Sequence, residues 1–218
     1  MGLERDNIEE IYNRLFDAYG PQHWWPADSP FEIMVGAILT QNTAWTNVEK
    51  AIINLKQADR LNTHSIIELA ETELAELIRP SGYFNLKAKR LKNYTSWFVE
   101  AGRFKGLTKY DDMELRTRLL SVNGVGPETA DDIMLYAFER PVFVIDTYTR
   151  RLLKVLGLIN GDEPYEQLRQ GFESALNPDV ALYNEYHALI VRHAKEKCSG
   201  ELSCQHCAIE APFGAFTE

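Results

Sequence analysis

The residue best placed to do chemistry in this sequence is Asp146, which follows a glycine-rich turn. Gly124 and Gly126 flank a valine, and a helical pattern begins directly after them. Asp146 lies twenty residues after Gly126. Glycines at such a turn leave backbone N–H groups uncovered, and N–H groups at a helix N-terminus bind phosphate oxygens. A carboxylate in this position can cap a helix or stabilise a developing positive charge. A Gly-x-Gly pair by itself is equally typical of a purely structural turn.

Three cysteines near the C-terminus form a second candidate site. Cys198, Cys204 and Cys207 are the only cysteines, and five and two residues separate them. An odd, clustered set without an export signal argues against a disulfide framework. The cysteines indicate a metal or cluster site, or the remnant of one.

The elements that must position these residues are helices. Apolar residues recur at helical spacing near the N-terminus, at Leu3, Ile8, Ile11, Leu15 and Tyr19. Further helical periodicity covers residues 45–57, 84–100, 111–121, 127–138, 147–156, 164–175 and 179–197. The run PVFVI at 141–145 could form a strand, but it has no partner strand, so we expect a buried connection. The sequence therefore predicts an all-α protein.

Two helix starts carry capping signatures. Ser29, Pro30 and Glu32 match a capping box with proline at the first helical position. The sequence SIIE at residues 65–68 repeats the serine-to-glutamate spacing. We therefore expect helices to begin after Ser29 and after Ser65.

Composition indicates a globular protein with an acidic balance. The 218 residues include 45% hydrophobic residues, and 32 acidic against 23 basic residues give a net charge of −9. That charge alone argues against nucleic acid, but screening confines each charge to about 8–10 Å, so local basic clusters decide phosphate contacts. The clusters are Lys87, Lys89, Arg90 and Lys92; Arg150, Arg151 and Lys154; and Arg192, Lys195 and Lys197. Taken singly, each is more typical of a solvated helix face.

The N-terminal sequence bears on location. It mixes acidic residues into an amphipathic pattern, which is typical of neither a signal peptide nor a transit peptide. No apolar run reaches the roughly eighteen residues of a membrane span. We expect no membrane partner and a cytoplasmic protein.

Three longer motifs carry a resemblance to a known family. They are VGAILTQNTAWTNVEKAI at 35–52, LIRPSGYFNLKAKRL at 77–91, and LLSVNGVGPETADDIMLYA at 119–137 followed by IDTYTRRLLKVLG. Together they span about residues 25–160 and resemble the helix-hairpin-helix DNA glycosylases of the endonuclease III superfamily. The resemblance implies a two-lobed fold with a central cleft. Residues 22–140 would form a six-helix barrel with the hairpin, and residues 1–21 and 141–218 a second lobe with the cysteine segment.

The resemblance also implies roles for single residues. Asp146 would be the catalytic carboxylate at the mouth of the cleft. Gln41 would enter the duplex to fill the gap left by a flipped nucleotide. The residues expected to contact DNA are Gln41, Gly124, Val125, Gly126, Lys87, Lys89 and Arg90. The partner would be double-stranded DNA with a damaged base, bound by a monomer, so the protein would be associated with the nucleoid when bound to DNA.

Glu128 separates this chain from the superfamily's lyases. In bifunctional members a lysine at this position attacks the sugar and forms a Schiff base. A carboxylate cannot form an imine, so we expect no abasic-site lyase activity. An acidic residue in the first turn of a helix is also favoured by the helix dipole alone.

Tryptophans near the first barrel helix indicate the substrate. HWWPADSP places two tryptophans and Pro26 there, and Trp45 follows Gln41 by four residues. Flat aromatic faces stack on an extruded base and attract a cationic one. Adjacent tryptophans are more often core residues, but with Glu128 they resemble the 3-methyladenine DNA glycosylase III branch. That resemblance implies a base pocket of Trp24, Trp25, Pro26, Trp45 and Glu128, and hydrolysis of alkylated purines by an aspartate-assisted water.

Cofactors are not required for this chemistry, because an alkylated base leaves easily. The cluster-bearing members use four cysteines, whereas Phe213 occupies the expected fourth position here and His206 is poorly placed to substitute. A [4Fe-4S] cluster on Cys198, Cys204 and Cys207 would therefore be incomplete. The resemblance also implies a monovalent cation held by the backbone carbonyls of Leu120, Val122 and Val125.

Two other functions stay open. One is an endonuclease III-like glycosylase and abasic-site lyase for oxidised pyrimidines, which Glu128 opposes. The other is a non-catalytic DNA-binding protein on the same fold, which Asp146 and the tryptophans oppose.

Overall fold

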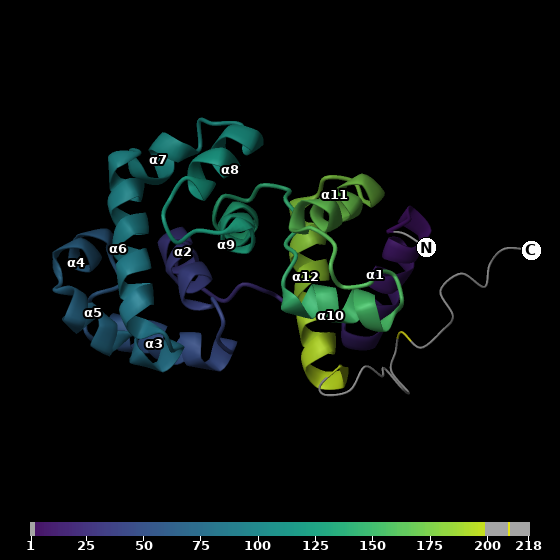
Figure 1. The fold of residues 1–218 in the computed structure, drawn as a ribbon, viewed down its shortest axis with the longest axis horizontal. Helices are drawn as coiled ribbons and strands as arrows, with labels where there is room; N and C mark the ends of the chain where they lie inside the picture. Colours follow the sequence, from purple (N-terminus) through teal and green to yellow (C-terminus); the bar gives the residue numbers. More distant parts are fainter. Residues whose placement is uncertain (1–2, 199–208, 210–218) are drawn as a thin grey trace, which may run out of the picture. The chain divides into compact units, whose positions relative to one another are not determined.

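The computed structural model describes residues 3–198 and residue 209, and within them the chain forms helices joined by short connections (Figure 1). No residue in that described part forms a β-strand. The all-α prediction is confirmed. The run at 141–145 is an irregular connection, as expected, and Phe143 and Val144 are fully buried in it.

The chain divides into two compact units. The first is Met1–Pro26 together with Pro141–Glu218, and the second is Ala27–Arg140. Each has its own core.

The boundary near the N-terminus lies at 26/27, five residues after the expected one at 21/22. The backbone N–H of Gln22 donates to Oε1 of Glu185 at 2.6 Å, and the Gln22 side chain donates to two carbonyls of the preceding turn. These bonds tie the segment to the first unit. Trp24 and Trp25 therefore belong to that unit and not to the barrel.

The first unit is built on one long helix. Its helices are α1 (Arg5–Tyr19), α10 (Thr147–Val155), α11 (Tyr165–Ala175) and α12 (Val180–Lys197). Helix α12 packs against α1 and α10, and α11 packs against α1. Aromatic rings fill the core: Phe143 stacks on Phe172 at 4.1 Å between centroids, and Tyr186 meets both edge-on.

The second unit surrounds α2. Its helices are α2 (Pro30–Leu39), α3 (Trp45–Gln57), α4 (Thr63–Glu68), α5 (Glu71–Leu77), α6 (Phe84–Glu100), α7 (Arg103–Leu107), α8 (Asp112–Leu120) and α9 (Pro127–Asp132), with a 3₁₀ turn η1 (Arg79–Ser81) and a π-helical turn η2 (Ile133–Ala137). Helix α2 contacts α3, α6, α9 and η2, which explains why it is apolar on nearly every side. Figure 1 shows α6 running between α2 and the pair α4 and α5.

The capping signatures have different outcomes. At α2, Ser29 Oγ accepts the Glu32 N–H at 3.2 Å, so the predicted cap is confirmed. The Glu32 carboxylate accepts the N–H of Asp28, one residue before the cap. At α4 the prediction was wrong: Asn62 is the cap, and its side chain accepts the Ser65 N–H at 2.8 Å. Asparagine caps at least as well as serine, so the earlier residue starts the helix.

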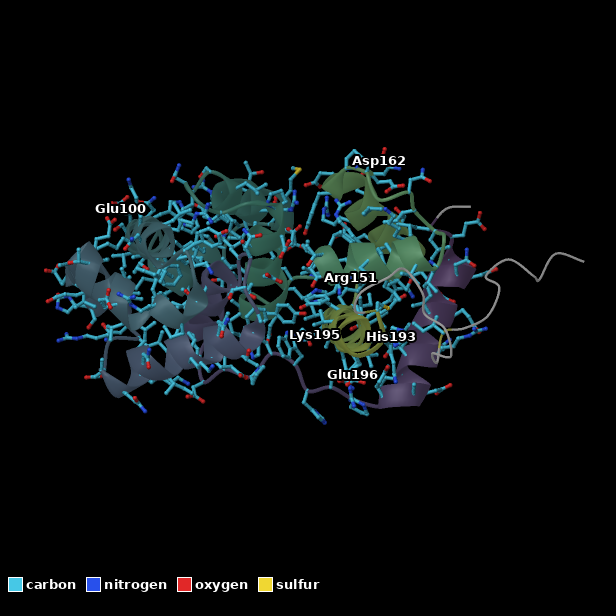
Figure 2. The ribbon with its side chains drawn as sticks, turned by 60° about the horizontal axis from the view of Figure 1, so that its bottom comes forward. Glu100, Arg151, Asp162, His193, Lys195 and Glu196 are labelled. Atoms are coloured by element: carbon cyan, nitrogen blue, oxygen red, sulfur yellow. The ribbon has the colours of Figure 1, made fainter. Side chains whose placement is uncertain are left out.

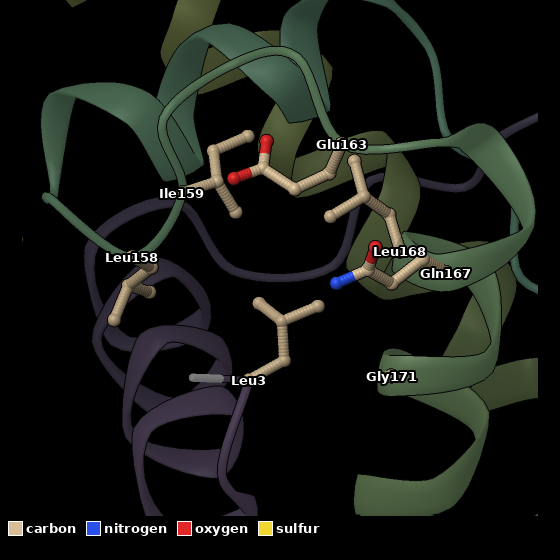
Figure 3. Close-up of a pocket in the computed structure, with 7 residues that line it drawn as sticks. All are labelled: Leu3, Leu158, Ile159, Glu163, Gln167, Leu168 and Gly171. Carbon is tan, nitrogen blue, oxygen red and sulfur yellow. The ribbon is translucent and has the colours of Figure 1, made fainter. Parts of the chain in front are cut away.

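The first unit also contains a small pocket, with a cavity volume of about 290 Å³ (Figure 3). It lies between Leu3, the connection after α10, and α11. Its carboxylate, Glu163, accepts the backbone N–H groups of Asn160 and Gly161 and so fixes that connection. None of the candidate site residues lines it.

Candidate active site and glycine hairpin

Asp146 is the N-cap of α10. Its Oδ1 accepts the N–H of Thr149 at 2.7 Å. Its Oδ2 lies 3.7 Å from Nε2 of His187, which α12 presents from its buried face. The Asp146 side chain is 13% exposed. Oδ1 therefore caps α10, and Oδ2 faces the imidazole of His187.

The charge state of Asp146 follows from these neighbours. Burial raises its pKa, whereas the adjoining His187 imidazole and the Thr149 N–H lower it. The balance leaves the pKa of Asp146 below its ordinary value. The carboxylate is thus ionised at neutral pH, which suits it to stabilise positive charge rather than to donate a proton.

The stabilising contribution of Asp146 is expected to disappear in acid. Because the pKa is lower in the folded state, the contribution is complete above the unfolded value of about 3.9 and is lost as the pH falls through the folded value. Urea unfolding of the wild type and of Asp146→Asn measures it. The wild-type advantage should be smaller at about pH 3.5 than at about pH 5. An advantage that grew as the pH fell from about 5 to about 3.5 would contradict the assignment.

His187 was missed by sequence reasoning. It lies forty-one residues after Asp146, in an amphipathic helix, with no motif around it. The only signal is its place four residues after buried Tyr183, on the face that packs inward. Such a position predicts burial but not which residue the imidazole meets.

The glycine turn joins α8 to α9. Gly124 has a φ of 98°, and a Cβ there would overlap the Arg90 side chain, so glycine is required for both conformation and space. Gly126 caps α9 and is exposed, with open space where a side chain would be. Only the Gly126 end of the turn is therefore uncovered as expected. Glu128 lies in the first turn of α9 and is half-buried.

The carbonyls expected to hold a cation are partly in use. Val122 O accepts the Val125 N–H at 3.0 Å within the turn. Val122 and Val125 are both buried. A carbonyl has a second lone pair, so the cation site involving these two residues and Leu120 stays a prediction.

Gln41 lies against the hairpin. Its Nε2 donates to Gly124 O at 3.0 Å and to Thr129 Oγ1 at 2.8 Å. Its Oε1 accepts from the guanidinium of Arg90. The structure therefore brings together three of the residues predicted to contact DNA: Gln41, Gly124 and Arg90.

The structure contradicts the role predicted for Lys87. It was expected to contact DNA, but it is 1% exposed, and its Nζ donates to Leu39 O at 2.8 Å and Ser81 O at 2.6 Å. Burial lowers the pKa of Lys87 to about 8. The ammonium ties the end of α2 to the turn before α6 and does not reach a phosphate. Lys89, by contrast, is exposed on the same helix.

The candidate base-pocket aromatics lie in both units. Trp45 is the first residue of α3, and its Nε1 donates to Glu49 Oε1 at 2.9 Å. Trp24 and Trp25 precede Pro26 in the first unit, with ring centroids 5.5 Å apart. All three tryptophans are half-buried. Their joint role stays a prediction.

The first unit carries a group of basic residues beside α10. Arg151 on α10 and Lys195 on α12, both labelled in Figure 2, lie against the ring of Tyr148 at 5.4 and 5.3 Å from its centroid. Arg151 also donates to the carbonyl of Cys198 at 3.4 Å. Basic side chains from two sequence clusters are therefore neighbours in space.

The cysteine site stays a prediction. Cys198 follows α12 and is buried. Cys204, Cys207, His206 and Phe213 lie outside the described residues. Within the described part of the chain, no three His, Cys, Asp or Glu side chains form a group that could hold a metal ion.

The all-helical fold, the glycine hairpin and the ionised aspartate that follows it define a helix-hairpin-helix DNA-repair fold. The family model described as HhH-GPD superfamily base excision DNA repair protein matches residues 35–178. The chain belongs to this superfamily and is a DNA glycosylase of base excision repair. The endonuclease III superfamily resemblance is thereby confirmed.

Known relatives match nearly the whole chain. MJ1434 of Methanocaldococcus jannaschii, provisionally named a DNA repair glycosylase, is 50% identical over 206 residues, covering 93% of this chain and 94% of the relative. Endonuclease III of Thermotoga maritima is 25% identical over 204 residues, covering 93% and 90%. The crystal structure of H. pylori 3-methyladenine DNA glycosylase (MagIII) bound to 1,N6-ethenoadenine has a TM-score of 0.76 and 30% identity, covering 90% of this chain and 99% of that one. No helix in the described residues is long and apolar enough to cross a membrane.

Proposed function

We propose that this chain is a monofunctional DNA glycosylase that releases alkylated purines such as 3-methyladenine. The observation that carries the proposal is the ionised carboxylate of Asp146, combined with a glutamate at position 128 where the lyases have lysine. The likeness to the 3-methyladenine glycosylase supports the same substrate class.

The chemistry needs one carboxylate. The protein flips the damaged nucleotide out of the duplex, and the bond between C1′ and the base nitrogen breaks with its electron pair leaving on the base. An N-alkylated purine carries a positive charge, so it leaves as a neutral molecule and needs no general acid. Asp146 then faces an oxocarbenium-like sugar, and its negative charge stabilises that cation. Water adds to C1′ and its proton passes to the carboxylate or to solvent.

Binding of the base is assigned to the tryptophans, and binding of the strand to the hairpin. Trp24, Trp25, Pro26 and Trp45 would supply the apolar and aromatic walls for the extruded purine. Gly126 and the exposed Lys89 would contact phosphates, and Gln41 would occupy the gap in the duplex. The protein would act as a monomer and without a catalytic cofactor.

Base release from methylated duplex DNA, with the products identified by chromatography, tests the proposal. The expected product is 3-methyladenine. Release of oxidised pyrimidines together with strand cleavage would instead assign the endonuclease III reaction. Duplex binding without release of either class would assign a non-catalytic role.

The glutamate at position 128 leads to a separate prediction, which is whether the abasic strand is cleaved after the base is released. Because a carboxylate forms no imine, the wild type should leave the abasic strand intact, and borohydride should trap no protein–DNA adduct. Glu128→Lys places an amine at this position and is expected to yield a weak trapped adduct. Glu128→Gln is the matched control and should yield none. A trapped adduct with the wild type would show that the monofunctional assignment is wrong.

A further inference from the structure

We propose that Arg90 is a positioning residue that holds the Gln41 side chain on the hairpin turn, and not a phosphate contact. The inference deepens the proposed function and rests on it, because it assigns the residue that prepares Gln41 for the duplex.

The first support is the complete set of bonds around the Gln41 amide. Its two N–H groups have acceptors at Gly124 O and Thr129 Oγ1, and its oxygen accepts from Arg90. A flipped amide would set an NH₂ group against the guanidinium, which has only donors. Arg90 therefore selects one orientation of the amide, with its donors toward the hairpin.

The second support is how Arg90 packs. Its aliphatic stem lies so close to Gly124 that any Cβ there would overlap it. The guanidinium is thus held beside both the turn and Gln41 by its own stem. Arg90 is half-buried, whereas its neighbour Lys89 is exposed.

The third support is a row of side chains on α6. Residues spaced by three share one face of a helix. Lys87 Nζ donates to Leu39 O, Arg90 donates to Gln41, and Asn93 Nδ2 donates to the Asn123 carbonyl at 3.4 Å. Through these bonds α6 holds both the end of α2 with the residues that follow it and the hairpin turn. Gln41 and the turn are therefore positioned together, and Arg90 is the member of the row that contacts both.

A double-mutant cycle tests whether Arg90 acts through Gln41. Arg90→Met keeps the stem against Gly124 and removes the guanidinium. Single-turnover release of 3-methyladenine is measured for the wild type, Arg90→Met, Gln41→Ala and the double variant. We expect Arg90→Met to slow release about tenfold in the wild type and less than about twofold in the Gln41→Ala background, because a residue that acts through another shows non-additivity.

Salt dependence of binding separates this role from a phosphate contact. Binding to a duplex with an abasic-site analogue is measured at several salt concentrations. The slope of log affinity against log salt should be unchanged in Arg90→Met and lower by about one in the matched control Lys89→Ala, which removes an exposed charge from the same helix.

Additive effects of Arg90→Met and Gln41→Ala, together with a slope reduced by about one, would overturn the inference and make Arg90 a phosphate contact. Thermal melting of each variant establishes that it folds. If the wild type releases no alkylated base, the proposed function fails. In that case the same four proteins are compared by their affinity for the abasic duplex. Coupling between Arg90→Met and Gln41→Ala in that affinity would support the positioning role, and additivity would contradict it.

Discussion

Asp146→Asn is expected to slow single-turnover release of 3-methyladenine about 100-fold or more while duplex affinity stays within about twofold of the wild type. The substitution removes the negative charge that is proposed to face the sugar, but it keeps a side-chain oxygen that can cap α10. Asparagine is as good a cap as aspartate, so the helix should remain formed. The loss should therefore lie in the chemical step, which single-turnover kinetics at saturating enzyme isolates.

The chain offers a matched control for this experiment. Asp179 caps α12 in the same unit, and its side chain accepts the Leu182 N–H at 2.9 Å, much as Asp146 accepts that of Thr149. Asp179→Asn makes the same chemical change at a cap with no assigned catalytic role, and it should release base at the wild-type rate. If Asp146→Asn turned over like Asp179→Asn, the aspartate would be only a helix cap and the catalytic assignment would be abandoned.

Local patterns predicted what depends on neighbours in sequence. The spacing of apolar residues predicted α1, whose buried residues Ile8, Ile11 and Leu15 were all on the expected face. The turn residues predicted the hairpin, and the serine before Pro30 predicted the start of α2. These features follow from the preferences of a few adjacent residues.

Features that depend on tertiary packing were missed or wrong. Lys87 looked like one member of a basic cluster, because no local signal says that carbonyl groups from the end of α2 and from η1 converge on it. His187 was not identified, because its position opposite Asp146 arises only when α12 packs on α10. The segment at residue 22 belongs to the first unit, where its backbone N–H donates to the carboxylate of Glu185, 163 residues later. In each case the deciding partner is distant in sequence.

The docked position of Gln41 changes how its role is understood. The resemblance implied a side chain ready to enter the duplex, whereas the structure has its amide bonded on three sides. These bonds hold the side chain in one place and one orientation beside the hairpin turn, which is the role proposed for Arg90.

Trp45→Ala is expected to weaken capture of the flipped base by about 1–3 kcal/mol, divided between binding of damaged duplex and the rate of release. Trp45 begins α3, and its indole N–H donates to Glu49 one turn later, a bond that favours one orientation of the ring before any base arrives. A preoriented ring stacks on the purine with little loss of conformational entropy, and its face attracts a cationic base. Affinity for undamaged duplex should not change, since that depends on phosphate contacts at the hairpin and nearby basic residues.

Trp45→Phe is the control that isolates the aromatic face. Phenylalanine keeps a stacking surface but cannot donate to Glu49, so this variant should retain most of the release rate that Trp45→Ala loses. Single-turnover release and binding to damaged and undamaged duplexes, measured at several salt concentrations, give the two contributions separately. An equal loss of affinity for damaged and undamaged duplex in Trp45→Ala would place the residue at the DNA backbone or in the folding of α3. Trp45 would then have to be removed from the proposed base pocket.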